Sequence, residues 1–228
     1  MPSLTVENYL KTVLQICIEA DSEWASTGQI ATALNVSPGT VTSMLKTLSD
    51  SSLANYKPYS GVKLTKQGRM LAVRMLRRHR LLELFLVRTL ELTWDQVHDE
   101  AERMEHAVSD ELIDRIDEYL ERPQVDPHGD PIPSADGTLT GEDYGLPLSD
   151  TDMGDTVRII RVRNQQPEFL RYLADNGMAL GAVGTVQENS DAGDIVAVQM
   201  QEKLVTLGQA AAEMLYVERV SDECSRAV

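Results

Sequence analysis

Cysteine is almost absent from this sequence. Cys17 and Cys224 are the only two cysteines in 228 residues, too few for a disulfide framework or for a zinc site built from thiolates. Long apolar runs are missing too: none approaches the roughly 18 residues that a membrane-spanning helix needs, and the N-terminus carries no signal-peptide pattern. The sequence therefore predicts a soluble, cytoplasmic protein. Cys17 falls on the apolar stripe of a helix and is expected in the core.

Basic residues are scarce overall but are unevenly distributed. The formal net charge is −15, which argues against a nucleic-acid partner. Residues 1–88, however, hold 11 Lys/Arg and 6 Asp/Glu, a net charge of +5, whereas residues 89–228 hold 10 and 30, a net charge of −20. An acidic cytoplasm would explain the total but not this asymmetry. A basic, DNA-facing N-terminal module on an acidic body explains both.

The N-terminal third has the pattern of a winged helix-turn-helix. Residues 4–20 show the apolar spacing of an amphipathic helix. Residues 25–53 indicate two further helices around a turn at Asn35-Val36, and Ser37 is placed to cap the second of them, with Pro38 at its first position. Residues 55–68 then predict two short strands around a Ser-Gly turn, which would form the wing.

The rest of the chain predicts a helical middle and a β-rich end. Long helical patterns cover residues 68–90 and 94–120, and residues 123–147 carry five prolines and four glycines, typical of a linker or an irregular arm. Beyond it, alternating apolar patterns predict the strands of a small barrel and one short helix ending at Gly177. The expected fold is mainly α with a β-rich C-terminal domain.

The second helix of a helix-turn-helix enters the major groove, so its first turns hold the candidate DNA contacts. The candidates there are Ser37, Pro38, Gly39, Thr40, Thr42, Ser43 and Lys46, and two more are Thr27 at the start of the preceding helix and Lys57 on the wing. Small hydroxyl side chains and a helix N-terminus suit phosphate contact and close approach. No Arg, Asn or Gln stands ready for bidentate base reading, so thymine methyls and DNA shape are expected to carry much of the specificity. Plain helix packing would give the same pattern.

Histidine and carboxylate residues recur at helical spacing in VHDEAERMEH. His98, Glu102, Glu105 and His106 all project toward one side of a helix. His79 and Glu83 are likewise four apart on the preceding helix, and such sets can enclose one or two divalent cations. Imidazole and carboxylate without thiolate favour Mn²⁺ or Fe²⁺. The alternative is an ordinary solvated helix face.

Taken together and in order, these motifs resemble the diphtheria-toxin-repressor and manganese-transport-regulator family of metal-dependent transcriptional repressors. The resemblance covers essentially the whole chain. Its motifs are ENYLKT, NVSPGTVTSML, LTKQGRMLA, RRHRLLELFL, VHDEAERMEH and PHGDPIP.

The resemblance implies a domain plan and a quaternary state. Residues 1–72 would form the winged helix-turn-helix DNA-binding domain, and residues 73–140 a helical metal-binding and dimerisation domain with a proline-rich arm. Residues 150–228 would form an SH3-like, FeoA-like domain. A homodimer would bind a palindromic double-stranded operator.

The resemblance also assigns metal ligands. A primary site would comprise Asn8, Glu102, Glu105 and His106. A second site would comprise His79, Glu83, His98 and Asn164, giving two sites per subunit. Glu102 stands where iron-type members have Cys, which favours manganese. Lys11 replaces the bridging Glu of the short manganese sensors, which favours two separated sites over a close binuclear cluster.

The expected function is thus repression of metal-uptake genes in response to Mn²⁺, or alternatively Fe²⁺, without enzymatic activity. Two rivals stay open at this point: a winged-helix regulator that senses an organic ligand, and a carboxylate-bridged di-metal enzyme, for which the needed carboxylates from several helices are not evident. The proline-rich arm could also dock into the SH3-like domain as a partner-binding module.

Overall fold

The computed structural model describes residues 3–139 and 145–220. Cys224 and part of the predicted proline-rich segment lie outside these ranges. The chain forms two compact units: unit 1 contains Met1–His79, Arg103–Ser109 and Pro133–Leu139, and unit 2 contains Arg80–Glu102, Asp110–Ile132 and Thr140–Val228.

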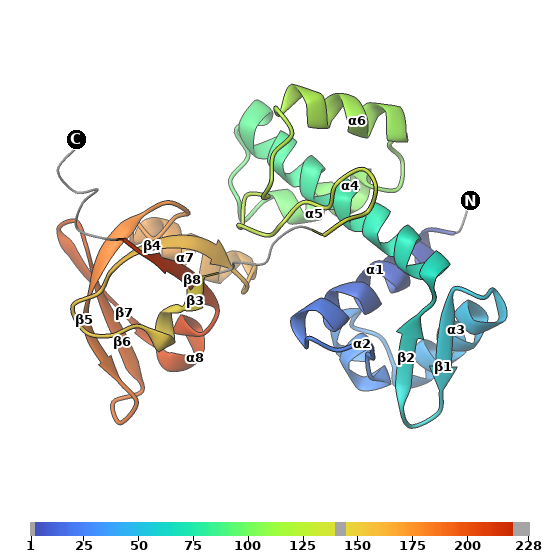
Figure 1. The fold of residues 1–228 in the computed structure, drawn as a ribbon, viewed down its shortest axis with the longest axis horizontal. Helices are drawn as coiled ribbons and strands as arrows, with labels where there is room; N and C mark the ends of the chain where they lie inside the picture. Colours follow the sequence, from blue (N-terminus) through green and yellow to red (C-terminus); the bar gives the residue numbers. More distant parts are fainter. Residues whose placement is uncertain (1–2, 140–144, 221–228) are drawn as a thin grey trace. The chain divides into compact units, whose positions relative to one another are not determined.

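Unit 1 contains the predicted winged helix-turn-helix (Figure 1). Its elements are α1 (Leu4–Glu19), α2 (Thr27–Ala33), α3 (Pro38–Asp50), and the wing strands β1 (Ala54–Lys57) and β2 (Gly61–Leu64), which pair antiparallel. Ser26 caps α2 through a capping box with Gln29.

Local chemistry sets the turns of unit 1. Asn35 ends α2 at a φ of 51°, the left-handed region that Asn tolerates best after Gly, and Ser37 caps α3 as predicted. Gly61 has a φ of 108°, and a Cβ there would lie 2.3 Å from the Ala25 carbonyl oxygen. Only glycine therefore allows the wing to approach the start of α2 this closely.

One apolar core joins the helices of unit 1. Leu10, Val13 and Leu14 of α1 are fully buried together with Val41 and Leu45 of α3. Cys17 belongs to the same core, as predicted. The position of α1 is thus linked through close packing to the helix expected to face DNA.

The middle of the chain forms three helices. They are α4 (Lys66–Leu90), α5 (Val97–Met104) and α6 (Asp110–Tyr119). The pattern over residues 94–120 therefore resolves into two helices. In unit 2, Leu81 and Leu82 of α4, Val97 of α5 and Ile113 of α6 are all buried.

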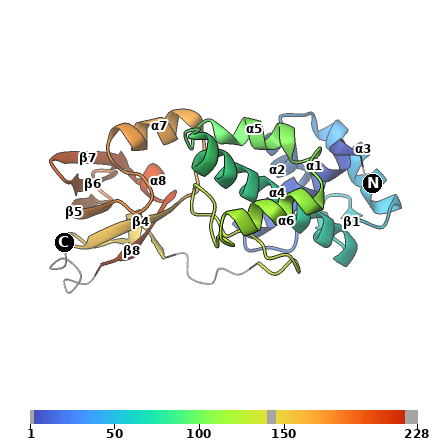
Figure 2. The same ribbon diagram turned by 90° about the horizontal axis from the view of Figure 1, so that it is seen from above.

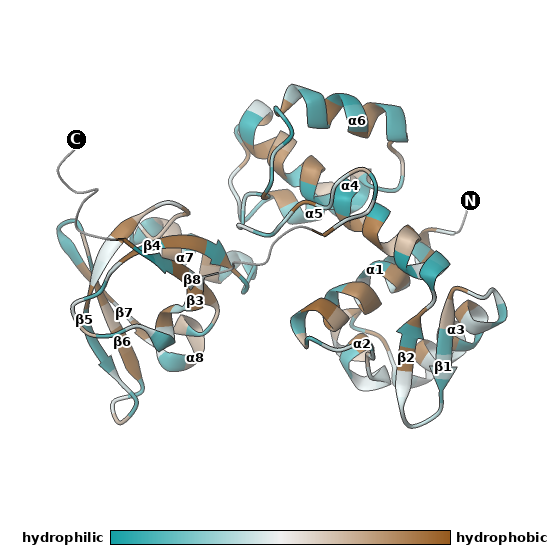
Figure 3. Cartoon of the chain, in the orientation of Figure 1, coloured by the Kyte–Doolittle hydropathy of each residue, from teal (hydrophilic) through white to brown (hydrophobic). Residues whose placement is uncertain are grey.

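The C-terminal part of unit 2 is an antiparallel sheet with strand order β3-β8-β4-β5-β6-β7. Figure 2 shows β4 and β8 side by side, and Figure 3 shows apolar stretches along the strands. The strands and the short helices between them are β3 (Leu146–Pro147), η1 (Leu148–Asp150), β4 (Thr156–Val162), α7 (Pro167–Asp175), β5 (Val183–Ser190), β6 (Ile195–Met200), β7 (Lys203–Gly208), α8 (Gln209–Ala212) and β8 (Leu215–Arg219). The apolar pattern of the sequence did not predict β3 or β8, although β8 pairs with β4 inside the sheet.

The proline-rich arm is held in place within unit 2. Arg80 donates a hydrogen bond to the Pro131 carbonyl, and Asp130 accepts from Arg161 on β4 at 2.6 Å and from Gln165 at 3.0 Å. Gly129 has a φ of 86°, and a Cβ there would lie 2.1 Å from the Ile160 carbonyl oxygen. The arm therefore packs directly against the β-rich domain.

Within the described residues, every helix is too short or too polar to cross a lipid bilayer.

Candidate metal centre and nucleic-acid interface

The first turns of α3 present small polar residues to solvent. Ser37, Thr40 and Ser43 are exposed, as are Pro38 and Gly39, and Thr42 is half-buried. Ser37 Oγ accepts a hydrogen bond from the Thr40 N–H at 3.1 Å.

Not all of these hydroxyls point their protons outward. The Thr42 hydroxyl donates to the Pro38 carbonyl at 2.9 Å, and the Ser43 hydroxyl donates to the Gly39 carbonyl at 3.1 Å. Because a hydroxyl has a single proton, Thr42 and Ser43 can donate to a DNA phosphate only after rotation about their side-chain bonds. The surface offers close approach first and hydrogen bonds second.

Positive charge flanks this surface. Lys46 is exposed on α3. Lys57 on the wing is exposed too, and its Nζ lies 5.1 Å from the centroid of the Trp24 ring. Lys63 is paired with Glu23, which reduces its value as a phosphate contact. Thr27 is half-buried at the first position of α2.

Glu105, directly after α5, is the most enclosed of the predicted metal ligands, with a fully buried side chain. Its Oε1 lies 2.6 Å from Lys11 Nζ, and its Oε2 lies 2.6 Å from His79 Nδ1. Burial by itself raises the pKa of the Glu105 carboxyl, but the His79 hydrogen bond and the Lys11 charge outweigh it, so the pKa lies below its usual value. Glu105 is therefore held as an anion.

Two buried polar atoms of the predicted primary site lack a hydrogen-bond partner among the described residues. They are His106 Nε2 and Asn8 Oδ1. His106 Nδ1 lies 2.8 Å from Glu7 Oε2, and its Nε2 lies 3.4 Å from Glu105 Oε1. A carboxylate on one ring nitrogen fixes the imidazole so that the other nitrogen faces the site, the usual arrangement behind a metal-bound histidine. Unsatisfied buried oxygen and nitrogen atoms of this kind fit a cation.

Glu102 completes this part of the site. It is half-buried on α5, and ligand atoms of His79, Glu102 and Glu105 all lie within 4.8 Å of one another. The structure thus groups Glu102 and Glu105 with His79 of α4, and His106 joins them through its contact with Glu105. The expectation of one helix carrying all four residues from His98 to His106 was wrong, because α5 ends at Met104 and Glu105 and His106 lie beyond it.

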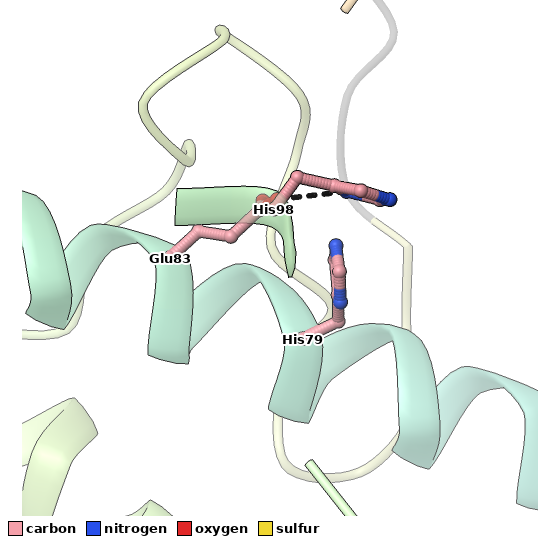
Figure 4. Close-up of side chains that lie close together, drawn as sticks. All are labelled: His79, Glu83 and His98. Carbon is pink, nitrogen blue, oxygen red and sulfur yellow. Dashed lines mark hydrogen bonds and ion pairs between the residues drawn. The ribbon is translucent and has the colours of Figure 1, made fainter. Parts of the chain in front are cut away.

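Glu83, His98 and His79 form a second group (Figure 4). His79 and Glu83 lie one turn apart on α4, and His98 Nδ1 of α5 lies 3.4 Å from Glu83 Oε1. One ligand atom from each of the three lies within 4.8 Å of the others. The Glu83 side chain is buried, whereas that of His98 is 47% exposed. Asn164 Oδ1 accepts a hydrogen bond from the Gln166 N–H at 3.1 Å, which uses one of its lone pairs.

A third group was not expected from the sequence. Glu83, Asp126 and His128 are all buried, and one ligand atom from each lies within 4.8 Å of the others. His128 Nε2 lies 2.8 Å from the Trp94 carbonyl oxygen, so it is the protonated nitrogen that donates. His128 Nδ1 has no hydrogen-bond partner among the described residues and faces Glu83 Oε2 at 3.8 Å and Asp126 Oδ1 at 4.0 Å.

The charge balance around Asp126 is unfavourable. Burial and the nearby Asp130 and Glu83 raise the pKa of Asp126 well above its usual value, and Arg80, whose Nε lies 3.6 Å from Asp126 Oδ2, lowers it only in part. His128 Nδ1, which faces Glu83 and Asp126, adds a buried polar atom without a hydrogen-bond partner among the described residues. A divalent cation would relieve both.

A sequence signal for the third group did exist. His128 is the one histidine outside the two helical clusters, and it stands two residues after Asp126 in DPHGD. No periodicity predicts that an irregular arm returns to α4, so the pairing with Glu83 needed the tertiary structure.

Comparison with known proteins matches these features in order. The family models described as the iron dependent repressor N-terminal DNA binding domain and the iron dependent repressor metal binding and dimerisation domain match residues 1–62 and 65–134. A FeoA domain model matches residues 146–219.

Individual relatives agree along most of the chain. The diphtheria toxin repressor of Corynebacterium glutamicum is 31% identical over 186 residues, which cover 78% of this chain and 81% of the relative. The chain belongs to the iron-dependent repressor family. The iron-dependent repressor IdeR of Mycobacterium leprae is 29% identical over 95% of this chain and 97% of its own. A solved structure of a manganese-dependent transcriptional repressor in complex with manganese is 38% identical, with a TM-score of 0.82, over 94% of this chain and all of that one.

Membership in the iron-dependent repressor family confirms the resemblance and the expected fold class. The family consists of metal-dependent DNA-binding transcriptional repressors and not of enzymes. The di-metal enzyme and the regulator of organic-ligand responses are therefore set aside. This repressor carries a DNA-binding domain and a metal-binding and dimerisation domain.

Lys46→Ala tests the DNA-facing surface. Because an exposed lysine acts on phosphate charge and not on base identity, we expect weaker binding to all sequences alike, with the slope of log K against log salt concentration reduced by about 1 per subunit. Fluorescence anisotropy at several salt concentrations measures this slope. Lys203→Ala, an exposed lysine on β7, removes the same charge and should leave the slope unchanged. An unchanged slope for Lys46→Ala would remove Lys46 from the interface.

Proposed function

We propose that this chain is a manganese-responsive repressor in which the cation joins α1 to the segment that follows α5. The observation that carries the proposal is His106 Nε2, a buried atom without a hydrogen-bond partner among the described residues, 3.4 Å from Oε1 of the anionic Glu105. Asn8 Oδ1 on α1 is a second buried atom without such a partner. Asn8 stands on α1 between Glu7, which contacts His106, and Lys11, which contacts Glu105. The proposed ligands of the primary site are Asn8, Glu102, Glu105 and His106.

The donor chemistry favours Mn²⁺ over Fe²⁺. The primary set offers carboxylate, amide and imidazole donors and no sulfur, and Glu102 occupies the position where a thiolate would favour a softer ion. The structure of a related manganese-dependent repressor with manganese bound is consistent with this choice. Fe²⁺ is the alternative that the same donors would accept.

Contacts within unit 1 explain how metal binding could affect the position of the DNA-facing helix. A bound divalent cation supplies positive charge that Asn8, Glu105 and His106 can share. Glu7 orients His106 from α1, so ligation by His106 and Asn8 holds α1 against the segment after α5. Since α1 shares its core with α3, fixing α1 also fixes the DNA-facing helix.

The regulated state is a homodimer on a palindromic operator. Two winged helices would then meet half-sites one DNA turn apart, about 34 Å. Metal acts by population shift, because the DNA-competent arrangement binds it more tightly. A shift from about 1:99 to about 99:1 needs about 5.5 kcal/mol of differential binding, which two sites per subunit could supply jointly. The proposed targets are metal-uptake genes, and the proposed location of the repressor is the cytoplasm.

Glu83 is the centre of a proposed second site. One set of partners is the predicted His79, His98 and Asn164, and the other is Asp126 and His128. The unpaired Nδ1 of His128 and the excess negative charge at Asp126 favour the second set. His98, being half exposed, could add a ligand to either arrangement.

Glu102→Gln tests the primary site and the function together. The change removes one anionic ligand from a half-buried position while keeping the side chain's shape. We expect metal-dependent DNA binding to need at least ~10–100-fold more Mn²⁺, the range in which even indirect ligand partners act. Chelator-stripped protein is titrated with Mn²⁺, anaerobic Fe²⁺, Co²⁺ and Zn²⁺ against its own upstream DNA by fluorescence anisotropy.

Glu188→Gln is the matched control, because Glu188 is exposed on β5 and far along the chain from every proposed ligand. It should respond to Mn²⁺ as the unaltered protein does. DNA binding that is equal in excess Mn²⁺ and in EDTA would refute metal regulation altogether.

The partners of Glu83 can be separated with one variant of each set. If Asp126 and His128 hold the second ion, Asp126→Asn lowers the Mn²⁺ stoichiometry from two to one per subunit, while His98→Ala weakens the second ion by less. Equilibrium dialysis with metal analysis gives the stoichiometry. Loss of the second ion in His98→Ala alone would instead support the set predicted from helical spacing.

A further inference from the structure

Lys11 places a positive charge against the carboxylate that the primary site needs. Its Nζ lies 2.6 Å from Glu105 Oε1 and 3.5 Å from His79 Nδ1. The Lys11 side chain is only 4% exposed and that of Glu105 is fully buried, so this is an internal ion pair. A buried ammonium is stable only where an anion compensates it.

The Lys11 ammonium pairs with Glu105 Oε1, the carboxylate oxygen that also faces His106. Glu105 Oε1 lies 3.4 Å from His106 Nε2, so a cation shared by these two atoms would lie next to the Lys11 ammonium. The other oxygen, Oε2, is engaged by His79 Nδ1 at 2.6 Å. Both oxygens of Glu105 thus already have a partner. A metal cation bound at Oε1 would repel the Lys11 ammonium strongly, because both are positive and close together in a buried site.

We infer that Lys11 is a tethered cation that competes with the metal for Glu105. In the metal-free protein its ammonium compensates the buried carboxylate, and when the metal binds, the ammonium withdraws from Oε1. Lys11 therefore raises the metal concentration at which the repressor responds. The inference rests on the proposed function, because it assumes that Glu105 is a metal ligand.

The chemistry of lysine suits this role. Its charge sits at the end of a flexible four-carbon stem, so it can leave one oxygen without breaking the helix that carries it. Displacement leaves a buried charge that must find new compensation, which costs free energy unless α1 adjusts. Since Lys11 and Asn8 are three residues apart on α1, its withdrawal and the ligation by Asn8 act on the same helix.

Lys11→Met tests the competition directly. Methionine keeps most of the length of the side chain and removes the charge, so we expect the first Mn²⁺ to bind at least ~10-fold more tightly. The readout is the electron paramagnetic resonance signal of free aqueous Mn²⁺ during titration of the stripped protein, without DNA. Lys203→Met, exposed on β7, makes the same change in net charge and should leave the affinity unchanged. Lys11→Arg retains the charge and should not tighten binding.

A second measurement on the unaltered chain covers the case in which Lys11→Met fails to fold. Amine acetylation followed by mass spectrometry should modify Lys11 slowly without metal and several-fold faster with saturating Mn²⁺, while Lys203 reacts equally in both. Equal Lys11 labelling in the two forms overturns the inference, as does Mn²⁺ affinity unchanged by Lys11→Met.

These failures differ from failure of the proposed function. If the unaltered chain binds Mn²⁺ and Glu102→Gln weakens that binding as expected, the function stands even when Lys11→Met leaves the affinity unchanged. If Glu102→Gln leaves Mn²⁺ affinity unchanged, both as a single change and when combined with Lys11→Met, the primary site itself is wrong. The inference about Lys11 is then refuted as well.

Discussion

The buried carboxylate of Glu105 is the interaction on which the rest of the centre depends. It draws together Lys11 from α1, His79 from α4 and its own segment after α5. Removing one partner of such a buried pair typically costs about 3–5 kcal/mol, because the other charge is left uncompensated. Glu105 therefore anchors α1. As an anion it also remains available to a cation that binds it more tightly than the Lys11 ammonium does.

The two proposed sites differ in how far the protein itself compensates the charge of their carboxylates. At Glu105 an internal cation already compensates the charge, and the pKa of that carboxyl is low. At Asp126, burial and the nearby Asp130 and Glu83 outweigh the charge of Arg80, and the pKa of Asp126 is high. A metal would have to displace a competitor at the first site and would meet an unmet demand for positive charge at the second. This contrast gives a physical reason for the sites to fill at different metal concentrations.

Local spacing was enough to predict the helix-turn-helix, the wing and the grouping of Glu102 and Glu105, since each depends on residues a few positions apart. The contact between Lys11 and Glu105 joins residues 94 positions apart, and no periodicity contains it. Asp126 and His128 lie on an irregular arm whose return to Glu83 is set by tertiary contacts at Asp130 and Gly129. The strand β8 was not predicted because only Leu215 and Val217 are buried in it, and the exposed Glu218 and Arg219 follow directly.

The most direct test of the central claim is electron–nuclear double resonance on protein carrying one equivalent of Mn²⁺ per subunit and ¹⁵N-labelled histidine. The account predicts a coupling from one directly bound histidine nitrogen, absent in His106→Gln and retained in His98→Gln. Absence of any histidine coupling at the first equivalent, or a coupling that disappears in His98→Gln and persists in His106→Gln, would contradict it.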